Sequence, residues 1–274
     1  MTAPDSTASN NVLANPRGVL RPRLDPGQFQ HHRQSPAPPL AGLIEHYWQA
    51  SWDLRGLPPR QQATLPHPNV HLVVEQGQAR IYGVHGDRFV RQLEGQDHVF
   101  GVKFKAGGFY PFYCQPVVSL FDRSTDVSAC FGTGSADFAE RVLGAPHFED
   151  MCAVADTFLL DHLPRADAWV ARLSGLLARI AQDTGITQVE HVVAMTGLSK
   201  RSLQRQFKKY VGVGPKWVIQ RYRLHEVLAQ IQAGKALNWA DLAMELGYFD
   251  QAHLTRDFRR LVGMTPRAYE ISLL

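Results

Sequence analysis

The chain has 274 residues, of which 45% are hydrophobic and 20% are charged. These proportions are typical of globular proteins, and the length suggests about two domains. No apolar run reaches the roughly 18–20 residues that a membrane-spanning helix needs, and the first residues lack the basic start and apolar centre of a signal peptide. We therefore expect a cytoplasmic protein. The three cysteines, Cys114, Cys130 and Cys152, are too few and too far apart for a disulfide framework or a zinc site built of cysteines alone.

The first part of the chain changes character near residue 36. Residues 1–35 are rich in Pro, Ser, Asn, Arg and Gln, so we expect a poorly ordered lead-in. The helical spacing of apolar residues at 40–47 then predicts a helix. Short apolar runs separated by glycines and polar clusters follow, which is typical of a β-rich domain. The predicted strands cover residues 71–75, 79–84, 88–93 and 98–105.

Helical periodicity returns after Gly107. We expect helices at 109–114, 135–143 and 148–162, and a boundary near 163–167. The sequence therefore predicts an α+β protein of two domains. Residues 36–167 would form a β-rich effector or assembly domain with connecting helices, for which a cupin-like half-barrel is one architecture, and residues 168–274 would form an all-helical domain.

Charge is distributed unequally between the two halves. Residues 1–174 carry a net charge of −2 and residues 175–274 a net charge of +6. No acidic residue lies between Glu190 and Glu226, and the basic residues in that stretch are Lys200, Arg201, Arg205, Lys208, Lys209, Lys216, Arg221 and Arg223. Such an excess indicates a surface for a polyanion, with a solvated helical face as the alternative.

The basic half contains an internal repeat, in which residues 192–215 resemble residues 242–266. Gly197 matches Gly247 at an offset of 50, and after one inserted residue the match continues at an offset of 51. The matched pairs are Leu203 and Leu254, Arg205 and Arg256, Phe207 and Phe258, Gly212 and Gly263, and Pro215 and Pro266. Each copy predicts a helix, a glycine turn and a second helix, which is the helix-turn-helix pattern.

Helix ends are marked by capping residues. Thr187 and Glu190 have the spacing of a capping box, and Ser199, Asn238 and Asp250 are suited to cap the next helices. Between the repeats, no glycine or proline interrupts the chain from Pro215 to Gly234. We expect one helix there of about 19 residues, roughly 28 Å long.

The outward residues of each second helix suit nucleic acid. Arginine pairs with guanine and glutamine with adenine in the major groove. The basic residues at the helix ends suit phosphate contact. The candidate phosphate contacts are Lys208, Lys209, Lys216, Arg259 and Arg260.

Residues 176–271 resemble the DNA-binding domain of the AraC/XylS family of bacterial transcription regulators. The resemblance rests on the segments GLSKRSLQRQFKKYVGVGPKWV, RYRLHEVLAQI and LAMELGYFDQAHLTRDFRRLVGMTPRAY. It implies two helix-turn-helix units joined by a long helix, double-stranded DNA as the partner and RNA polymerase as a further candidate partner. The base-reading residues that it implies are Arg201, Gln204, Arg205, Gln251, His253 and Arg256. One departure is Phe249, which stands where a small polar cap is usual.

Residues 36–145 resemble the N-terminal domain of a subgroup of these regulators whose effectors are mostly unknown. The resemblance rests on PLAGLIEHYW, ATLPHPNVHLVV and VFGVKFKAGGFYPFY, and it departs where His67 and His71 replace the usual aspartates. A small-molecule effector would bind in the mouth of such a barrel. Candidate pocket residues are Trp48, Phe104 and Tyr110, for which packing in the core is the alternative.

We expect no catalytic residue, metal or cofactor. His67, His71 and Glu75 carry metal-binding side chains, but four residues of strand span about 13 Å, too far for one metal ion. Cys114 lacks a neighbouring base and is suited to be a small buried hydrophobe. Two alternatives stay open: an enzyme with metal or cysteine chemistry in residues 36–145, and a regulator whose N-terminal half binds another protein.

Overall fold

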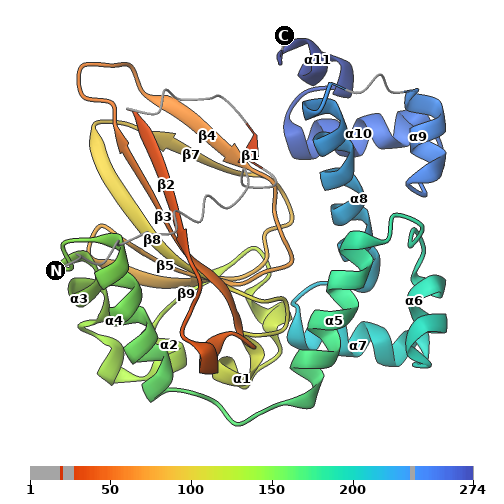
Figure 1. Ribbon diagram of the computed structural model, residues 1–274. Helices are drawn as coiled ribbons and strands as arrows, with labels where there is room; N and C mark the ends of the chain where they lie inside the picture. Colours follow the sequence, from red (N-terminus) through yellow and green to blue (C-terminus); the bar gives the residue numbers. More distant parts are fainter. Residues whose placement is uncertain (1–18, 21–27, 235–237, 274) are drawn as a thin grey trace, which may run out of the picture.

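The structure is a computed structural model that describes residues 19–20, 28–234 and 238–273. They form a β-rich N-terminal domain and an all-helical C-terminal domain, which lie side by side (Figure 1). The α+β prediction is therefore confirmed. None of the helices in these ranges combines the length and the hydropathy required of a membrane span.

The N-terminal domain contains two antiparallel sheets. The larger sheet has the strand order β2 (Phe29–Gln34), β3 (Ile44–Asp53), β8 (Gln96–Phe104), β5 (His71–Glu75), β6 (Gln78–Tyr82) and β9 (Ser124–Asp126). The smaller sheet has the order β1 (Val19–Leu20), β4 (Arg60–Thr64) and β7 (Phe89–Leu93). The four strands that the sequence predicts correspond to β5, β6, β7 and β8.

Short helices cover one face of the larger sheet (Figure 1). They are η1 (Pro38–Leu40), α1 (Tyr110–Tyr113), η2 (Val117–Leu120), α2 (Ser128–Phe131), η3 (Thr133–Ser135), α3 (Phe138–Leu143) and α4 (Phe148–Asp161). Tyr47 is fully buried against them, and its hydroxyl donates a 2.6 Å hydrogen bond to Asp156 of α4.

Side chains alternate along a strand, so the two faces of the larger sheet contact different parts of the domain. On β8, Phe100, Val102 and Phe104 are fully buried against the helices. Val99 and Lys103 point the other way, towards the smaller sheet. The aromatic core and the residues facing the smaller sheet thus come from the same strands.

The predicted helix at residues 40–47 is wrong. Only η1 is helical there, and β3 begins at Ile44. Strand β3 pairs with β8 between Ile44 and Asp53 and with β2 between Tyr47 and Trp52, and this tertiary pairing outweighs the local helical spacing. Part of the expected lead-in is also ordered, because β1 and β2 lie within it; residues 1–18 and 21–27 lie outside the described residues.

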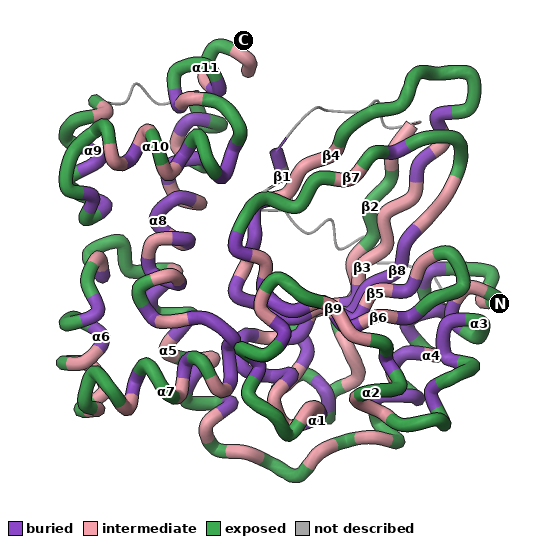
Figure 2. Tube along the Cα trace, turned by 180° about the vertical axis from the view of Figure 1, so that it is seen from behind, coloured by how far each residue is buried: buried purple, intermediate pink, exposed green. Residues whose placement is uncertain are grey.

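The C-terminal domain is arranged around α8, whose inward residues are buried (Figure 2). Its helices are α5 (Ala168–Gln182), α6 (Val189–Thr196), α7 (Lys200–Tyr210), α8 (Pro215–Gln232), α9 (Trp239–Glu245), α10 (Gln251–Val262) and α11 (Pro266–Ile271). The single long helix between the repeats is confirmed, with 18 residues.

Most of the predicted caps are present. The side chains of Ser199, Asn238 and Asp250 accept hydrogen bonds from backbone N–H groups in the first turns of α7, α9 and α10. The predicted capping box at Thr187 and Glu190 is wrong. Gln188 precedes α6 without a side-chain cap, and Glu190 instead forms a 2.6 Å ion pair with Lys200.

Gly101 is required by the packing of Trp48. The two residues are register partners on β8 and β3, and a Cβ at Gly101 would overlap the indole ring. We expect Gly101→Ala to lower the free energy of unfolding by about 1–3 kcal/mol, because the ring must move from its site. Urea unfolding measures the change, and Gly134→Ala is the control because a Cβ there meets no atom within 4 Å. A stability equal to that of the wild type would contradict this packing argument.

Candidate nucleic-acid interface and adjoining cavity

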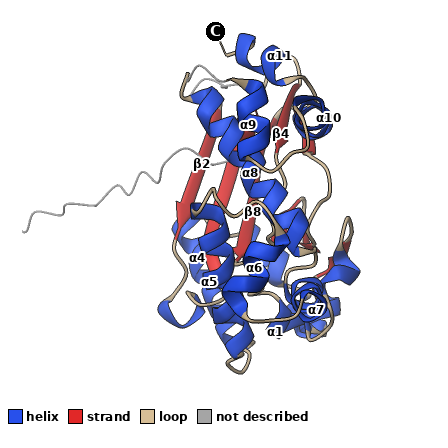
Figure 3. Cartoon of the chain, turned by 90° about the vertical axis from the view of Figure 1, so that its right-hand side faces the viewer, coloured by secondary structure: helices blue, strands red, loops and turns tan. Residues whose placement is uncertain are grey.

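Two helix-turn-helix units lie at the two ends of α8. In the first, α6 and α7 are joined through Gly197, and in the second, α9 and α10 are joined through Gly247. Both glycines have positive φ angles, 66° and 74°, which favour glycine over residues with a Cβ. Viewed from the side, α7 and α10 are both seen nearly end on at the same side of the molecule (Figure 3). The second helices of the two units therefore lie on the same side of the molecule.

Helix α7 has one buried and one exposed face. Leu203 and Phe207 are fully buried in the core of the first unit. The exposed residues include all three candidate base readers of this unit and one candidate phosphate contact: Arg201, Gln204, Arg205 and Lys208. This side of α7 is therefore available to a ligand.

Helix α10 repeats this arrangement with different side chains. Gln251, Arg256 and Arg259 are exposed, whereas His253 is half-buried with its ring edge-on to Tyr248 at 5.2 Å. Arg256 and Arg259 stand where Arg205 and Lys208 stand in the first unit.

Two further residues of the second unit, Thr255 and Phe249, belong to the description of its outward surface. At the offset of 51, Thr255 is the counterpart of Gln204, and the sequence reasoning missed it although the repeat contains that signal. Phe249 is the inserted residue and is 90% exposed. It does not disturb the start of α10, because Asp250 caps that helix.

The second residue of each basic pair faces the N-terminal domain. The Lys209 ammonium lies 4.7 Å from the centre of the Tyr110 ring. Its counterpart Arg260 forms ion pairs of 2.5 Å with Asp87 and 2.9 Å with Asp257. A phosphate contact by Arg260 would require the ion pair with Asp87 to open.

Two basic residues of the acid-free stretch do not belong to the exposed surface. Arg221 and Arg223 on α8 are buried. Arg221 donates a 3.2 Å hydrogen bond to the carbonyl of Gly86, and burial lowers its pKa to about 10. Arg223 donates to the carbonyl of Ile180. The exposed basic surface is thus smaller than the sequence suggests, although Lys216 is part of it.

The loop between β6 and β7 joins the N-terminal domain to α8 and α10. Besides the bonds made by Gly86 and Asp87, Arg88 donates a 2.9 Å hydrogen bond to the carbonyl of Val262 at the end of α10. On either side of these contacts, His85 and Phe89 line a cavity in the N-terminal domain. The loop therefore contacts the cavity and the second helix-turn-helix unit at once.

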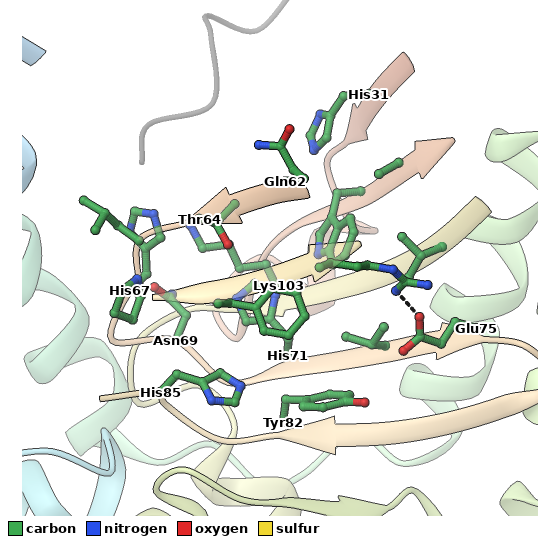
Figure 4. A pocket seen from close by; sticks show the side chains of 18 of the residues that line it. His31, Gln62, Thr64, His67, Asn69, His71, Glu75, Tyr82, His85 and Lys103 are labelled. Carbon is green, nitrogen blue, oxygen red and sulfur yellow. Dashed lines mark hydrogen bonds and ion pairs between the residues drawn. The ribbon is translucent and has the colours of Figure 1, made fainter. Parts of the chain in front are cut away.

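This cavity has a volume of about 320 Å³ and lies between the two sheets (Figure 4). Of the three candidate pocket residues, Trp48 lines this cavity, and Phe104 and Tyr110 do not. Phe104 points to the helices on the other face of the sheet, and the Tyr110 ring packs on Tyr210 at the domain boundary with centroids 4.3 Å apart.

Polar residues of the cavity went unrecognised. The sequence reasoning missed Arg33, His46 and Lys103, which lie on β2, β3 and β8 and face the smaller sheet. The alternation of side chains along β8 already predicted that Lys103 and Phe104 lie on opposite faces of the sheet. No comparable signal was available for Arg33, because β2 lay within the expected lead-in.

The histidines and cysteines are placed as follows. His67 and His71 both line the cavity, and His67 stacks on His225 of α8 with centroids 4.3 Å apart. In the described ranges, no three His, Cys, Asp or Glu side chains are grouped to hold a metal ion. Cys114 is exposed, which corrects its expected burial, and burial raises the pKa of Cys130 to about 11 and of Cys152 to about 12.

A pair of helix-turn-helix units held on one long helix defines a DNA-binding protein of the double helix-turn-helix class. Residues 192–270 match the helix-turn-helix domain family. Residues 32–126 match a domain family of unknown function, DUF6597.

Two curated relatives match the C-terminal domain. The F1 operon positive regulatory protein of Yersinia pestis is 31% identical over 83 residues, which are 30% of this chain and 27% of that protein. A protein of Streptomyces antibioticus, whose name provisionally assigns it to the AraC-like transcription regulators, is 31% identical over 81 residues, 30% of this chain and 26% of its own length. The matched part thus spans about a quarter of each relative. The C-terminal domain is therefore a helix-turn-helix domain similar to those of a positive regulatory protein and of an AraC-like transcription regulator.

Among solved structures, the chain is similar to ToxT of Vibrio cholerae. An apo form of a ToxT variant with one substitution is 9% identical with a TM-score of 0.38, covering 95% of this chain and 99% of that one. The wild-type form with a bound unsaturated fatty acid is 10% identical with a TM-score of 0.38, covering 93% and 94%.

The ion pair between Asp87 and Arg260 provides a test of the contact between the domains. We expect Asp87→Asn to strengthen DNA binding by on the order of 0.5–1 kcal/mol and to steepen the salt dependence by up to about 0.9, because Arg260 becomes available to a phosphate. Fluorescence anisotropy over a salt series measures both quantities. Asp137→Asn removes the same charge from an exposed site remote from α10 and is the control. Equal binding by Asp87→Asn and the control would show that Arg260 does not reach DNA.

Proposed function

We propose that the chain is a sequence-specific DNA-binding transcription regulator that acts by binding and not by catalysis. The observation that carries the proposal is the tandem of helix-turn-helix units, with exposed arginines at the equivalent positions Arg205 and Arg256. Arginine is the commonest reader of guanine in the major groove. The uninterrupted basic surface of α7 supports the same function.

The length of α8 determines the form of the DNA site. Its 18 residues correspond to about 27 Å at 1.5 Å per residue. A rigid helix of that length would hold α7 and α10 about one turn of DNA apart, roughly 34 Å, on one face of the duplex. Each recognition helix would then enter one of two successive major grooves.

The roles within this site follow from the side chains. Arg201, Gln204 and Arg205 would read bases of the first half-site, with Lys208 and Lys216 on phosphates. In the second half-site, Gln251, His253 and Arg256 would read bases and Arg259 would contact a phosphate. Because the two sets differ, the half-sites of one chain should differ in sequence.

The N-terminal domain would act as a sensor for a small molecule. The cavity between the sheets supports this role, because the loop that borders it also contacts α8 and α10. A ligand that moves this loop would change the position of the second unit. RNA polymerase is a further partner in this proposal, as expected for a protein that acts on transcription.

Arg205→Ala tests the first recognition helix. We expect the substitution to weaken binding to the selected site by about 1–3 kcal/mol and to relax the preference for one base pair. Lys208→Ala is the matched comparison, because loss of a phosphate contact should weaken all DNA sequences alike and reduce the salt slope by about one. Selection from a random DNA pool followed by anisotropy titration measures both. Wild-type affinity and preference in Arg205→Ala would exclude this residue as a base reader.

Insertion of about five base pairs between the half-sites tests the role of α8. The insertion turns one half-site to the opposite face of the duplex, and α8 cannot follow without breaking its packing. We therefore expect the affinity to fall towards that of a single half-site, whereas an insertion of about ten base pairs should restore the face but keep the half-sites too far apart for one chain to reach both. Gel-shift titration with the three DNA lengths measures this. Unchanged binding after the five-base-pair insertion would mean that only one unit reads DNA.

A further inference from the structure

The cavity between the two sheets has ends of different chemistry. One end is lined by the apolar residues Trp52, Leu93 and Val99, beside the ion pair of Arg91 and Glu75, in which the Arg91 guanidinium lies 5.1 Å from the centre of the Trp52 ring. The other end is polar, formed by His46, His71 and Lys103, which are direct neighbours across β3, β8 and β5. Figure 4 shows His71 and Lys103 of this group. A molecule that fills this cavity must therefore have both an apolar and a polar part.

Positive charge exceeds negative charge around the cavity. Glu75 forms an ion pair with Arg91, and Glu45 forms a 2.9 Å ion pair with Lys103. Within the described ranges, Arg33 has no carboxylate within 4 Å, although it lines the same cavity. A guanidinium stays protonated in proteins. Among the residues that the structure describes, the site thus has one cation, Arg33, without a carboxylate partner.

Two buried donors come from neighbouring strands. Arg33 on β2 and Trp48 on β3 are register partners, and both line the cavity. The Nε atom of Arg33 and the Nε1 atom of Trp48 are buried and have no hydrogen-bond acceptor in the described chain. A buried donor without an acceptor is destabilising, so an acceptor at this position would be favoured.

The neighbouring imidazoles add hydrogen-bonding capacity but no charge at neutral pH. Burial is the main cause that lowers the pKa of His46 to about 4 and of His71 to about 3, and the Lys103 ammonium lowers both further. The excess charge around the cavity is therefore that of a single guanidinium, which matches a monoanion.

We propose that the cavity binds a small amphipathic organic monoanion, a carboxylate with an apolar body. The carboxylate accepts hydrogen bonds from Arg33 and Trp48, because charge-assisted bonds to a guanidinium are the strongest available to such an anion. The body lies against Val99, Leu93 and Trp52, the last of which is four residues beyond Trp48 on β3, or about 13 Å of strand. The proposal deepens the sensor role and rests on it for its biological meaning.

Matched acids and amides separate charge from shape. We would titrate the full chain, without DNA, with 2-naphthoate against 2-naphthamide and with octanoate against octanamide, following tryptophan fluorescence and thermal unfolding. We expect at least one acid to bind, and to bind about tenfold or more tightly than its amide. Arg33→Gln should remove this preference. Arg60→Gln is the control, because Arg60 is an exposed arginine of β4 that does not line the cavity.

Three results would overturn the proposal: equal binding of acid and amide, wild-type acid binding by Arg33→Gln, or no binding of either acid at about 1 mM. Circular dichroism establishes whether Arg33→Gln is folded; if it is not, the comparison of acid and amide in the wild type decides. Because DNA is absent, a negative result with retained DNA binding would reject the ligand class and leave the DNA-binding function intact.

Discussion

Burial of α8 is the constraint on which the rest of the structure depends. Its first half, with Val218 and Ile219, lies in the core of the first helix-turn-helix unit, and that core also takes in Val84 and Ala106 of the N-terminal domain. Its second half lies in the core of the second unit, which also takes in Leu20 and Leu65 of the N-terminal domain. One helix therefore fixes the two units relative to each other, and both cores extend into the N-terminal domain.

The basic pairs at the ends of α7 and α10 have two roles: one residue of each pair is exposed, and the other contacts the N-terminal domain. The first residues of the two basic pairs, Lys208 and Arg259, are exposed, and the second residues contact the N-terminal domain. The glycines that follow these helices are also equivalent: Gly212 lies against Val117, and Gly263 lies against Arg88. Both recognition helices thus end at the domain boundary, where a change in the N-terminal domain would affect how DNA is held.

The larger sheet connects this boundary to the cavity. One face of its strands packs on the helices, and the other face lines the cavity, so that neither face is left to solvent over its central strands. The polar end of the cavity leads through Tyr82 and His85 into the loop that contacts α8 and α10. His85 lines the cavity, and Asp87, only two residues later, contacts Arg260 of the second unit.

The sequence by itself determined the local features of this protein. The repeat, the turns at Gly197 and Gly247, the caps at Ser199 and Asp250 and the uninterrupted helix between the units all depend on residues close together in the chain. Short apolar runs separated by glycines and polar clusters likewise predicted four of the strands, because such runs are a local pattern.

Tertiary structure decided what depends on distant partners. Residues 44–47 belong to strand β3 because β2 and β8 pair with that strand, although the apolar spacing at 40–47 favours a helix. Arg221 and Arg260 turn away from the expected DNA surface because Gly86 and Asp87 offer them an acceptor and a carboxylate from the other domain. Arg33 and Trp48 are register partners on the adjacent strands β2 and β3, which no spacing in the chain reveals. In each case the deciding interaction is a contact between segments far apart in sequence, and local propensity carries no information about such contacts.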